Sequence, residues 1–136
     1  MGFLRALVSG NAKLPQPMRA GAGMLANPVV SENTSDAAMT MTAAWIAGGY
    51  IAATTALGAD RIYTTDTGAN LTLAFPEMDI GDAYCFVVSN LGTGAFDIIM
   101  AGGDGVTLVP SSGNILNQTS HMACLVKTGD ETYDLY

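Results

Sequence analysis

From residue 80 onward, hydrophobic and polar positions follow a β pattern. Short runs of branched, aromatic and other apolar residues are bounded by glycine-rich turns, as is typical of strands in an all-β domain. The predicted strands are 83–91, 96–101, 106–109, 115–118, 122–127 and 132–136. Strands this short, with a turn signal every ten or so residues, predict a β-sandwich or a jelly roll.

The preceding region mixes strand and helix signals. Residues 42–48 predict a short helical turn with Thr42 as its N-cap and Gly48 as its stop, although a strand with Met39, Met41 and Trp45 on one face is the alternative. Strands are predicted at 50–54 and 61–65. Residues 69–75 fit either a strand or a helical turn.

Residues 1–36 are predicted to form an extended N-terminal arm, and residues 37–136 the β-sandwich module. Pro15, Pro17 and Pro28 interrupt any helix in the arm. A segment of this length reaches on the order of 100 Å when extended and cannot enclose a core of its own. We therefore expect it to become ordered only along a neighbouring subunit.

Charge is sparse and unevenly placed in this 136-residue chain. Apolar residues make up 49% and charged residues 12%, and the net charge is −7. Residues 1–31 carry +3 from Arg5, Lys13 and Arg19, while the rest combines two basic with twelve acidic residues, a formal −10. The acidic balance argues against nucleic acid as a partner. The basic arm predicts docking on an acidic surface.

Candidate reactive residues are few. Cys85 and Cys124 are predicted to be buried free thiols, with one disulfide as the alternative. His121 is the only histidine, and it is expected on the opposite strand face from Cys124. One histidine with two scattered cysteines predicts neither a zinc site nor a nucleophile–base pair.

Three acidic residues, Glu77, Asp79 and Asp82, lie close together in the sequence. A solvated loop is the favoured interpretation, with calcium binding or glycosidase-type carboxylate chemistry as alternatives. The single stretch Gly102–Leu108 is similar to a calcium-binding repeat, but one copy predicts a β-turn. No cofactor is predicted.

No membrane or targeting segment is predicted. The uncharged stretch 37–59 is rich in alanine, threonine and glycine, which makes it a poor membrane span. The N-terminal apolar run is too short for a signal peptide, and Ala6 occupies the position at which myristoylation favours Ser or Thr.

The order of turn and strand segments over residues 42–136 resembles the small β-sandwich modules of virus and tailed-phage structural proteins, especially capsid decoration (cement) proteins. The segments that carry the resemblance are 42–51, 60–69, 73–76, 80–90, 102–109 and 133–136. It implies a non-enzymatic, jelly-roll-like homotrimer, made in the host cytoplasm, that binds the major capsid protein on the outer capsid surface and stabilises contacts between capsomers.

A cement role favours the arm as the capsid-binding element. The expected contact residues are Arg5, Lys13 and Arg19 for acidic grooves, with Phe3, Leu4 and Leu14 as apolar anchors. The alternative is a tail or fibre-tip module that binds a host receptor through exposed aromatic residues such as Trp45, Tyr50 or Tyr63. A hydrolase using the acidic loop at 77–82 is a further alternative.

Overall fold

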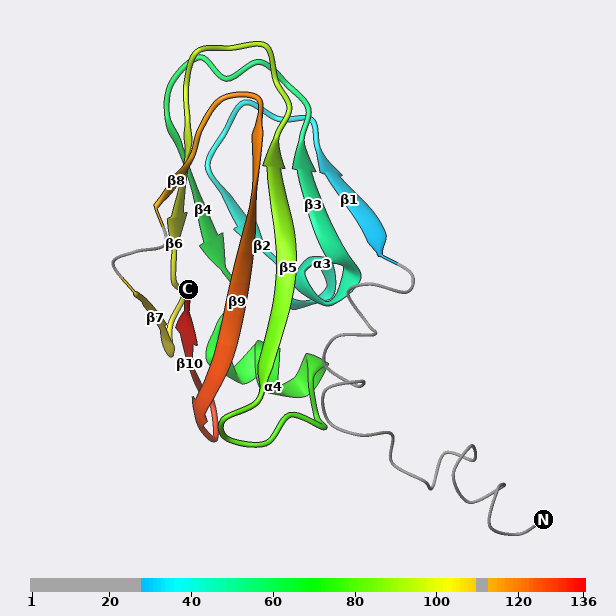
Figure 1. Cartoon of the computed structure of the whole chain (residues 1–136), viewed down its shortest axis with the longest axis vertical. Coiled ribbons are helices and arrows are strands. Elements are labelled where there is room, and N and C mark those ends of the chain that lie inside the picture. The colour runs from blue at the N-terminus through cyan, green and yellow to red at the C-terminus, as the bar shows by residue number, and fades with distance from the viewer. Residues whose placement is uncertain (1–27, 110–112) are drawn as a thin grey trace, which may run out of the picture.

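A computed structural model describes residues 28–109 and 113–136 as two facing β-sheets with two short helices (Figure 1). The six-stranded sheet has the order β1 (Val29–Asn33), β3 (Gly49–Ala53), β5 (Ala83–Asn90), β9 (Thr119–Gly129), β10 (Thr132–Leu135) and β7 (Val106–Leu108). The four-stranded sheet has the order β2 (Met39–Met41), β4 (Arg61–Thr65), β6 (Ile98–Ala101) and β8 (Asn114–Ile115). The prediction of a β-rich, two-sheet module is confirmed.

The chain alternates between the two sheets as it advances. It passes from β1 to β2, returns through helix α3 (Ala43–Gly48) to β3, passes to β4, returns through helix α4 (Gly68–Ala74) to β5, and passes to β6. Because every pass runs in the same direction, β1, β3 and β5 are parallel in one sheet, and β2, β4 and β6 are parallel in the other. The first half of the module is therefore wound like a coil.

One hydrophobic core fills the space between the sheets. Phe86 and Leu125 of the six-stranded sheet, and Tyr63 and Ile98 of the four-stranded sheet, are fully buried in the same cluster. Ile46 of α3 and Leu71 of α4 are also fully buried there, so the two helices pack against the same core. Both helices are too short to be stable in isolation.

Both helices begin at a threonine that follows a strand of the four-stranded sheet. Thr42 Oγ1 accepts a hydrogen bond from Trp45 N, as predicted for the 42–48 turn, and Thr67 Oγ1 accepts one from Asn70 N. The ambiguous segment 69–75 is mostly helix because Thr67 caps it and because Leu71 takes the core position of that turn. No helix within the described residues is long and apolar enough to cross a membrane.

The jelly-roll-like arrangement is not confirmed. A jelly roll is built from antiparallel strands, whereas five of the eight strand pairings in the described part of the chain are parallel. Antiparallel pairing is confined to β5–β9, β9–β10 and β6–β8. Only the coarser β-sandwich description applies.

The predicted boundary between arm and module lies too far along the chain. Val29–Asn33 form β1, which pairs in parallel with β3 from Val29↔Gly49 to Asn33↔Ala53. These residues belong to the sheet because Asn33 is buried, its carbonyl accepts from Thr54 N, and its side chain contacts Tyr63. Residues 1–27 lie outside the described part of the chain.

The prediction of free thiols is wrong. Cys85 and Cys124 are directly opposed in the β5–β9 register and form a disulfide, with a Cα–Cα distance of 4.0 Å. Directly opposed residues on antiparallel strands lie close enough to be bridged. The two cysteines are 39 residues apart in sequence, so only the long-range register brings them together.

Candidate functional site

Four loops meet at one end of the sandwich, and we call this surface the loop platform; it comprises residues 34–38, 54–60, 91–97 and 116–118. Backbone hydrogen bonds join successive windings here, from Thr54 N to the Asn33 carbonyl (3.1 Å) and from Leu91 N to the Ala53 carbonyl (2.8 Å). Glycine allows the close stacking, because a Cβ at Gly92 would overlap the Thr55 carbonyl oxygen. The platform is thus a set of stacked, mutually bonded loops.

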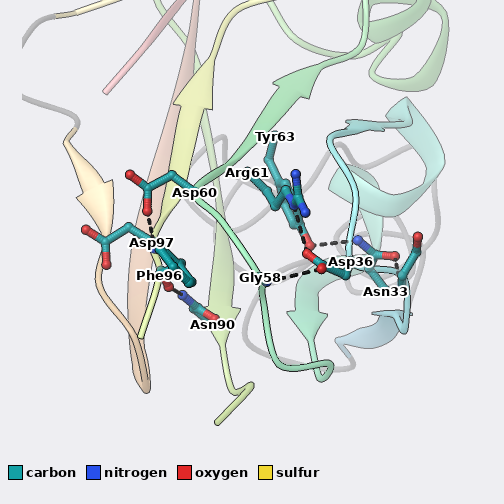
Figure 2. Close-up of polar contacts among 10 residues, drawn as sticks. Asn33, Asp36, Gly58, Asp60, Arg61, Tyr63, Asn90, Phe96 and Asp97 are labelled. Atoms are coloured by element: carbon teal, nitrogen blue, oxygen red, sulfur yellow. Dashed lines mark hydrogen bonds and ion pairs between the residues drawn. The ribbon is translucent and has the colours of Figure 1, made fainter. Parts of the chain in front are cut away.

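Asp36 connects the first loop to the second. Its Oδ1 accepts a hydrogen bond from Arg61 Nε at 2.8 Å, and its Oδ2 accepts one from Gly58 N at 3.1 Å (Figure 2). The bond from the Arg61 side chain, followed by that from Gly58, holds the pKa of Asp36 below its ordinary value. The ion pair is exposed, so it orients the loops more than it stabilises the fold.

Below this ion pair lies a buried polar contact between the two sheets. Asn33 Nδ2, at the end of β1, donates to the Tyr63 hydroxyl at 2.7 Å, and Asn33 Oδ1 accepts from Ser35 N at 3.0 Å. Burial raises the pKa of Tyr63 above its ordinary value. The hydroxyl therefore stays protonated near neutral pH and accepts the Asn33 bond as part of the structure.

Two further aspartates, Asp60 and Asp97, connect the loops that precede β4 and β6. Asp60 Oδ1 accepts from Asp97 N at 2.9 Å (Figure 2). Asp97 Oδ1 accepts from Asn117 N at 3.3 Å. Arg61 N in turn donates to the Asp97 carbonyl at 3.0 Å. Each carboxylate accepts a hydrogen bond from a backbone N–H of the next loop, so the platform is acidic and its loops are bonded to one another.

Apolar side chains project from the same end. Asn90 Nδ2 donates to the Phe96 carbonyl at 3.0 Å (Figure 2). It also donates to the Ile115 carbonyl at 3.4 Å, which brings the 91–97 and 116–118 loops together. Leu91, Phe96 and Leu116 on these adjoining loops are 47%, 41% and 57% exposed. We call these three side chains the apolar tip. Scattered exposed leucines are ordinary, and what distinguishes these three residues is that they lie on adjoining loops at one end of the module.

Within residues 28–109 and 113–136, the loop platform offers exposed surface, and its aspartates bond backbone amides or arginine. In the part of the chain that the structure describes, no group of three or more His, Cys, Asp or Glu residues could hold a metal ion. Ser89 Oγ bonds the hydroxyls of Tyr50 and Ser120, so its hydrogen-bond partners are other alcohols. An activated nucleophile requires a base within hydrogen-bond reach, which these contacts do not supply.

The structure leaves the predicted capsid-binding residues untested. Phe3, Leu4, Arg5, Lys13, Leu14 and Arg19 all lie outside the described residues. Glu77, Asp79 and Asp82 lie on the α4–β5 loop, where Asp82 Oδ2 accepts from Asp79 N at 3.0 Å. That bond closes a turn, which is the ordinary use of an aspartate in a loop.

The aromatic residues expected at a receptor cleft are largely occupied elsewhere. Tyr63 is fully buried and bonded to Asn33, so it cannot contact a receptor. Tyr50 is half-buried on the outer face of β3 and accepts a bond from Ser89 Oγ, and Trp45 packs partly against the core.

The apolar tip was missed because its leucines and phenylalanine were counted within strands or turns. The signal that could have found this end of the sandwich is the Asp that precedes three strands of the four-stranded sheet, β2, β4 and β6, at Asp36, Asp60 and Asp97.

Comparison of the chain with known protein families, with curated proteins and with solved structures finds no match. The candidate site is therefore interpreted from its geometry and charge alone.

Proposed function

We propose that this chain is a non-enzymatic structural virion protein, a capsid decoration (cement) protein that binds the outer capsid surface as a homotrimer. In this proposal the two-sheet module stands in place of the jelly-roll-like module of such proteins, and residues 1–27 contact the major capsid protein. The observation that carries it is the charge division: Arg5, Lys13 and Arg19 precede a module with a formal charge of −10.

The division of charge supports a basic N-terminal segment that docks in an acidic groove of the partner, joined to an acidic module that stays outside that groove. The module's two basic residues are already engaged, because Arg61 bonds Asp36 and Lys127 Nζ donates to the Met78 carbonyl at 3.2 Å. The N-terminal segment therefore carries the basic groups that remain for an acidic partner. Like charge would discourage the module itself from entering an acidic groove.

Cementing follows from mass action. A protein that bridges capsomers binds the assembled shell and not the separated subunits, so each binding event shifts the equilibrium toward the intact shell. Three N-terminal segments held in one trimer act at a high effective concentration, so each single contact can be weak.

Binding to purified, undecorated capsids tests the proposal with full-length protein. We expect an Arg5→Gln, Lys13→Gln, Arg19→Gln variant to lose capsid occupancy by about tenfold or more, because each lost cationic contact costs affinity. A control with Thr40→Glu, Thr54→Glu and Asn114→Glu reaches the same net charge through exposed module positions and should bind like wild type. Wild-type protein that leaves the capsids bare, or a triple-Gln variant that fills them, would refute the proposal.

A second candidate function is receptor binding by a tail or fibre-tip module, which the loop platform favours. The apolar tip is exposed, and beside it Asn117 Oδ1 is buried without a hydrogen-bond partner within the described residues. Residue 28 lies at the far end of β1 from the platform, so an anchored N-terminus leaves the tip free. Antibody labelling of intact particles separates the two, because cement labels the shell and a fibre tip labels the tail.

A further inference from the structure

The outer face of the six-stranded sheet carries a row of apolar side chains. The register places Val30, Tyr50, Val87 and Met122 side by side on β1, β3, β5 and β9. Their strand neighbours Ile51, Phe86 and Ala123 lie in the core, so the row itself must face away from the other sheet. In Figure 1, β3, β5 and β9 lie toward the viewer, and no described element lies over them.

The apolar character continues beyond this row. Val30 and Met122, at its two ends, are 60% and 53% exposed. The Cys85–Cys124 disulfide forms the next row, and the Ala83–Val126 pair follows it. We call these three rows the outer strip. With strands about 4.8 Å apart and alternate residues about 7 Å apart, the strip covers on the order of 300 Å².

Charge is absent from the strip although the module is strongly acidic. Of the twelve acidic residues, only Glu32 and Asp134 lie in strands. Glu32 lies on the edge strand β1, and Asp134 lies on β10 opposite Val126, at one end of the strip. The others lie in loops and turns at the ends of the sandwich or between strands. Two copies of an acidic protein repel where their carboxylates meet, so contact between copies favours an uncharged face.

The same charge pattern indicates which kind of partner binds the outer strip. A basic partner, including the N-terminal segment, would find no carboxylate in the centre of the strip, whereas a second copy brings an equally neutral apolar surface. The four-stranded sheet is a poorer candidate, because its outer positions combine Ile62 and Ile99 with Thr40, Thr64 and Asn114. A mixed surface of that kind gains less from leaving water.

We propose that copies of this chain associate through the outer strip of the six-stranded sheet. The inference names the subunit interface of the oligomer in the proposed function and rests on that proposal for its biological setting, but self-association itself is a property of the isolated protein. Standard interfaces bury about 800 Å² per partner, so the strip forms the core of the contact and strand margins complete it.

Sedimentation velocity over a concentration series of the full-length protein tests the inference. We expect a concentration-dependent oligomer, and Met122→Lys should weaken it about tenfold or more, because a lysine would be buried there without a partner. Ile62→Lys is the matched control, since Ile62 is 48% exposed on the outer face of the other sheet. Circular dichroism confirms that both variants are folded.

A second measurement uses the disulfide, which lies within the strip. Association should slow its reduction by dithiothreitol at high protein concentration, and Met122→Lys should abolish that dependence while Ile62→Lys preserves it. A monomer at all concentrations, or an oligomer that Met122→Lys leaves intact, would overturn the inference. Capsid binding by wild-type protein in either case would leave the capsid-binding part of the proposed function standing, so the two failures are distinguishable.

Discussion

Removing the disulfide should cost a large share of the stability of this protein. Cys85 and Cys124 join the two longest strands and close a loop spanning 39 residues of sequence separation. Loop-closure entropy in the unfolded chain gives about 4 kcal/mol for a loop of that size. Small domains are stable by about 5–15 kcal/mol, so the double variant Cys85→Ala, Cys124→Ala should fold but unfold at much lower denaturant concentration.

Urea unfolding monitored by circular dichroism measures this effect in three samples. The samples are oxidised wild type, wild type with dithiothreitol, and the double alanine variant. The unfolding midpoint should be highest for oxidised wild type, and it should be the same for reduced wild type and the alanine variant. The matched control is dithiothreitol added to the alanine variant, which has no disulfide to lose and should not change. The free energies must be calculated with each sample's own denaturant dependence, because a cross-link makes the unfolded chain more compact and so lowers the surface exposed on unfolding.

The result that would refute this reasoning is a difference below about 1 kcal/mol between oxidised and reduced wild type. The β5–β9 ladder pairs residues from Ala83↔Val126 to Asn90↔Thr119. A small difference would mean that this ladder already restrains the unfolded chain, so that the covalent bond removes little further entropy.

Three other changes test the packing and the hydrogen bonds. Gly68→Ala should destabilise by about 2–4 kcal/mol in thermal unfolding, because a Cβ there would overlap a backbone oxygen of the β9–β10 turn, whereas Gly113→Ala, with open space around it, should change stability by less than about 0.5 kcal/mol. Tyr63→Phe should cost about 1–3 kcal/mol in urea unfolding because Asn33 Nδ2 loses its buried acceptor; unchanged stability would mean that Asn33 finds another partner. Burial raises the pKa of Asp66, but hydrogen bonds from Asn70, Ala43 and Thr67 outweigh it and leave the pKa lowered. Asp66 should therefore stabilise the fold above the ordinary aspartate pKa of about 3.9 and lose that contribution as the pH falls below it; Asp66→Asn should reduce the acid dependence of the melting temperature, and an unaltered pH profile would contradict this assignment.

Local signals in the sequence located most elements but not their pairing. The strand at 61–65 was predicted with its observed bounds, and 83–91 differs from β5 by one residue. These strands are dense in branched and aromatic residues between clear turns. Helix α3 was found from its threonine cap, but it ends one residue later than predicted: Gly48 is its last residue, and Gly49, with a φ of 91°, is the C-cap.

Errors arose where long-range geometry decides the outcome. β1 is a short strand after a proline-rich stretch, and only its pairing with β3 makes it one. The Cys85–Cys124 bond depends on the β5–β9 register, and the parallel pairing depends on the direction of each return through α3 and α4. The platform was missed for the same reason, because Asp36, Asp60 and Asp97 come from three separate windings.

The parallel pairing of β1 with β3 determines how a mechanical load on the N-terminus would enter the module. β1 runs from Val29 toward Asn33, alongside Gly49–Ala53. A pull on residue 28 along the strand axis would load all of the β1–β3 hydrogen bonds at once, in shear, because ladder bonds lie across the strands. A pull perpendicular to the sheet would open them one after another. An N-terminal tether lying along the edge strand would therefore resist detachment better than one leaving the sheet at a right angle.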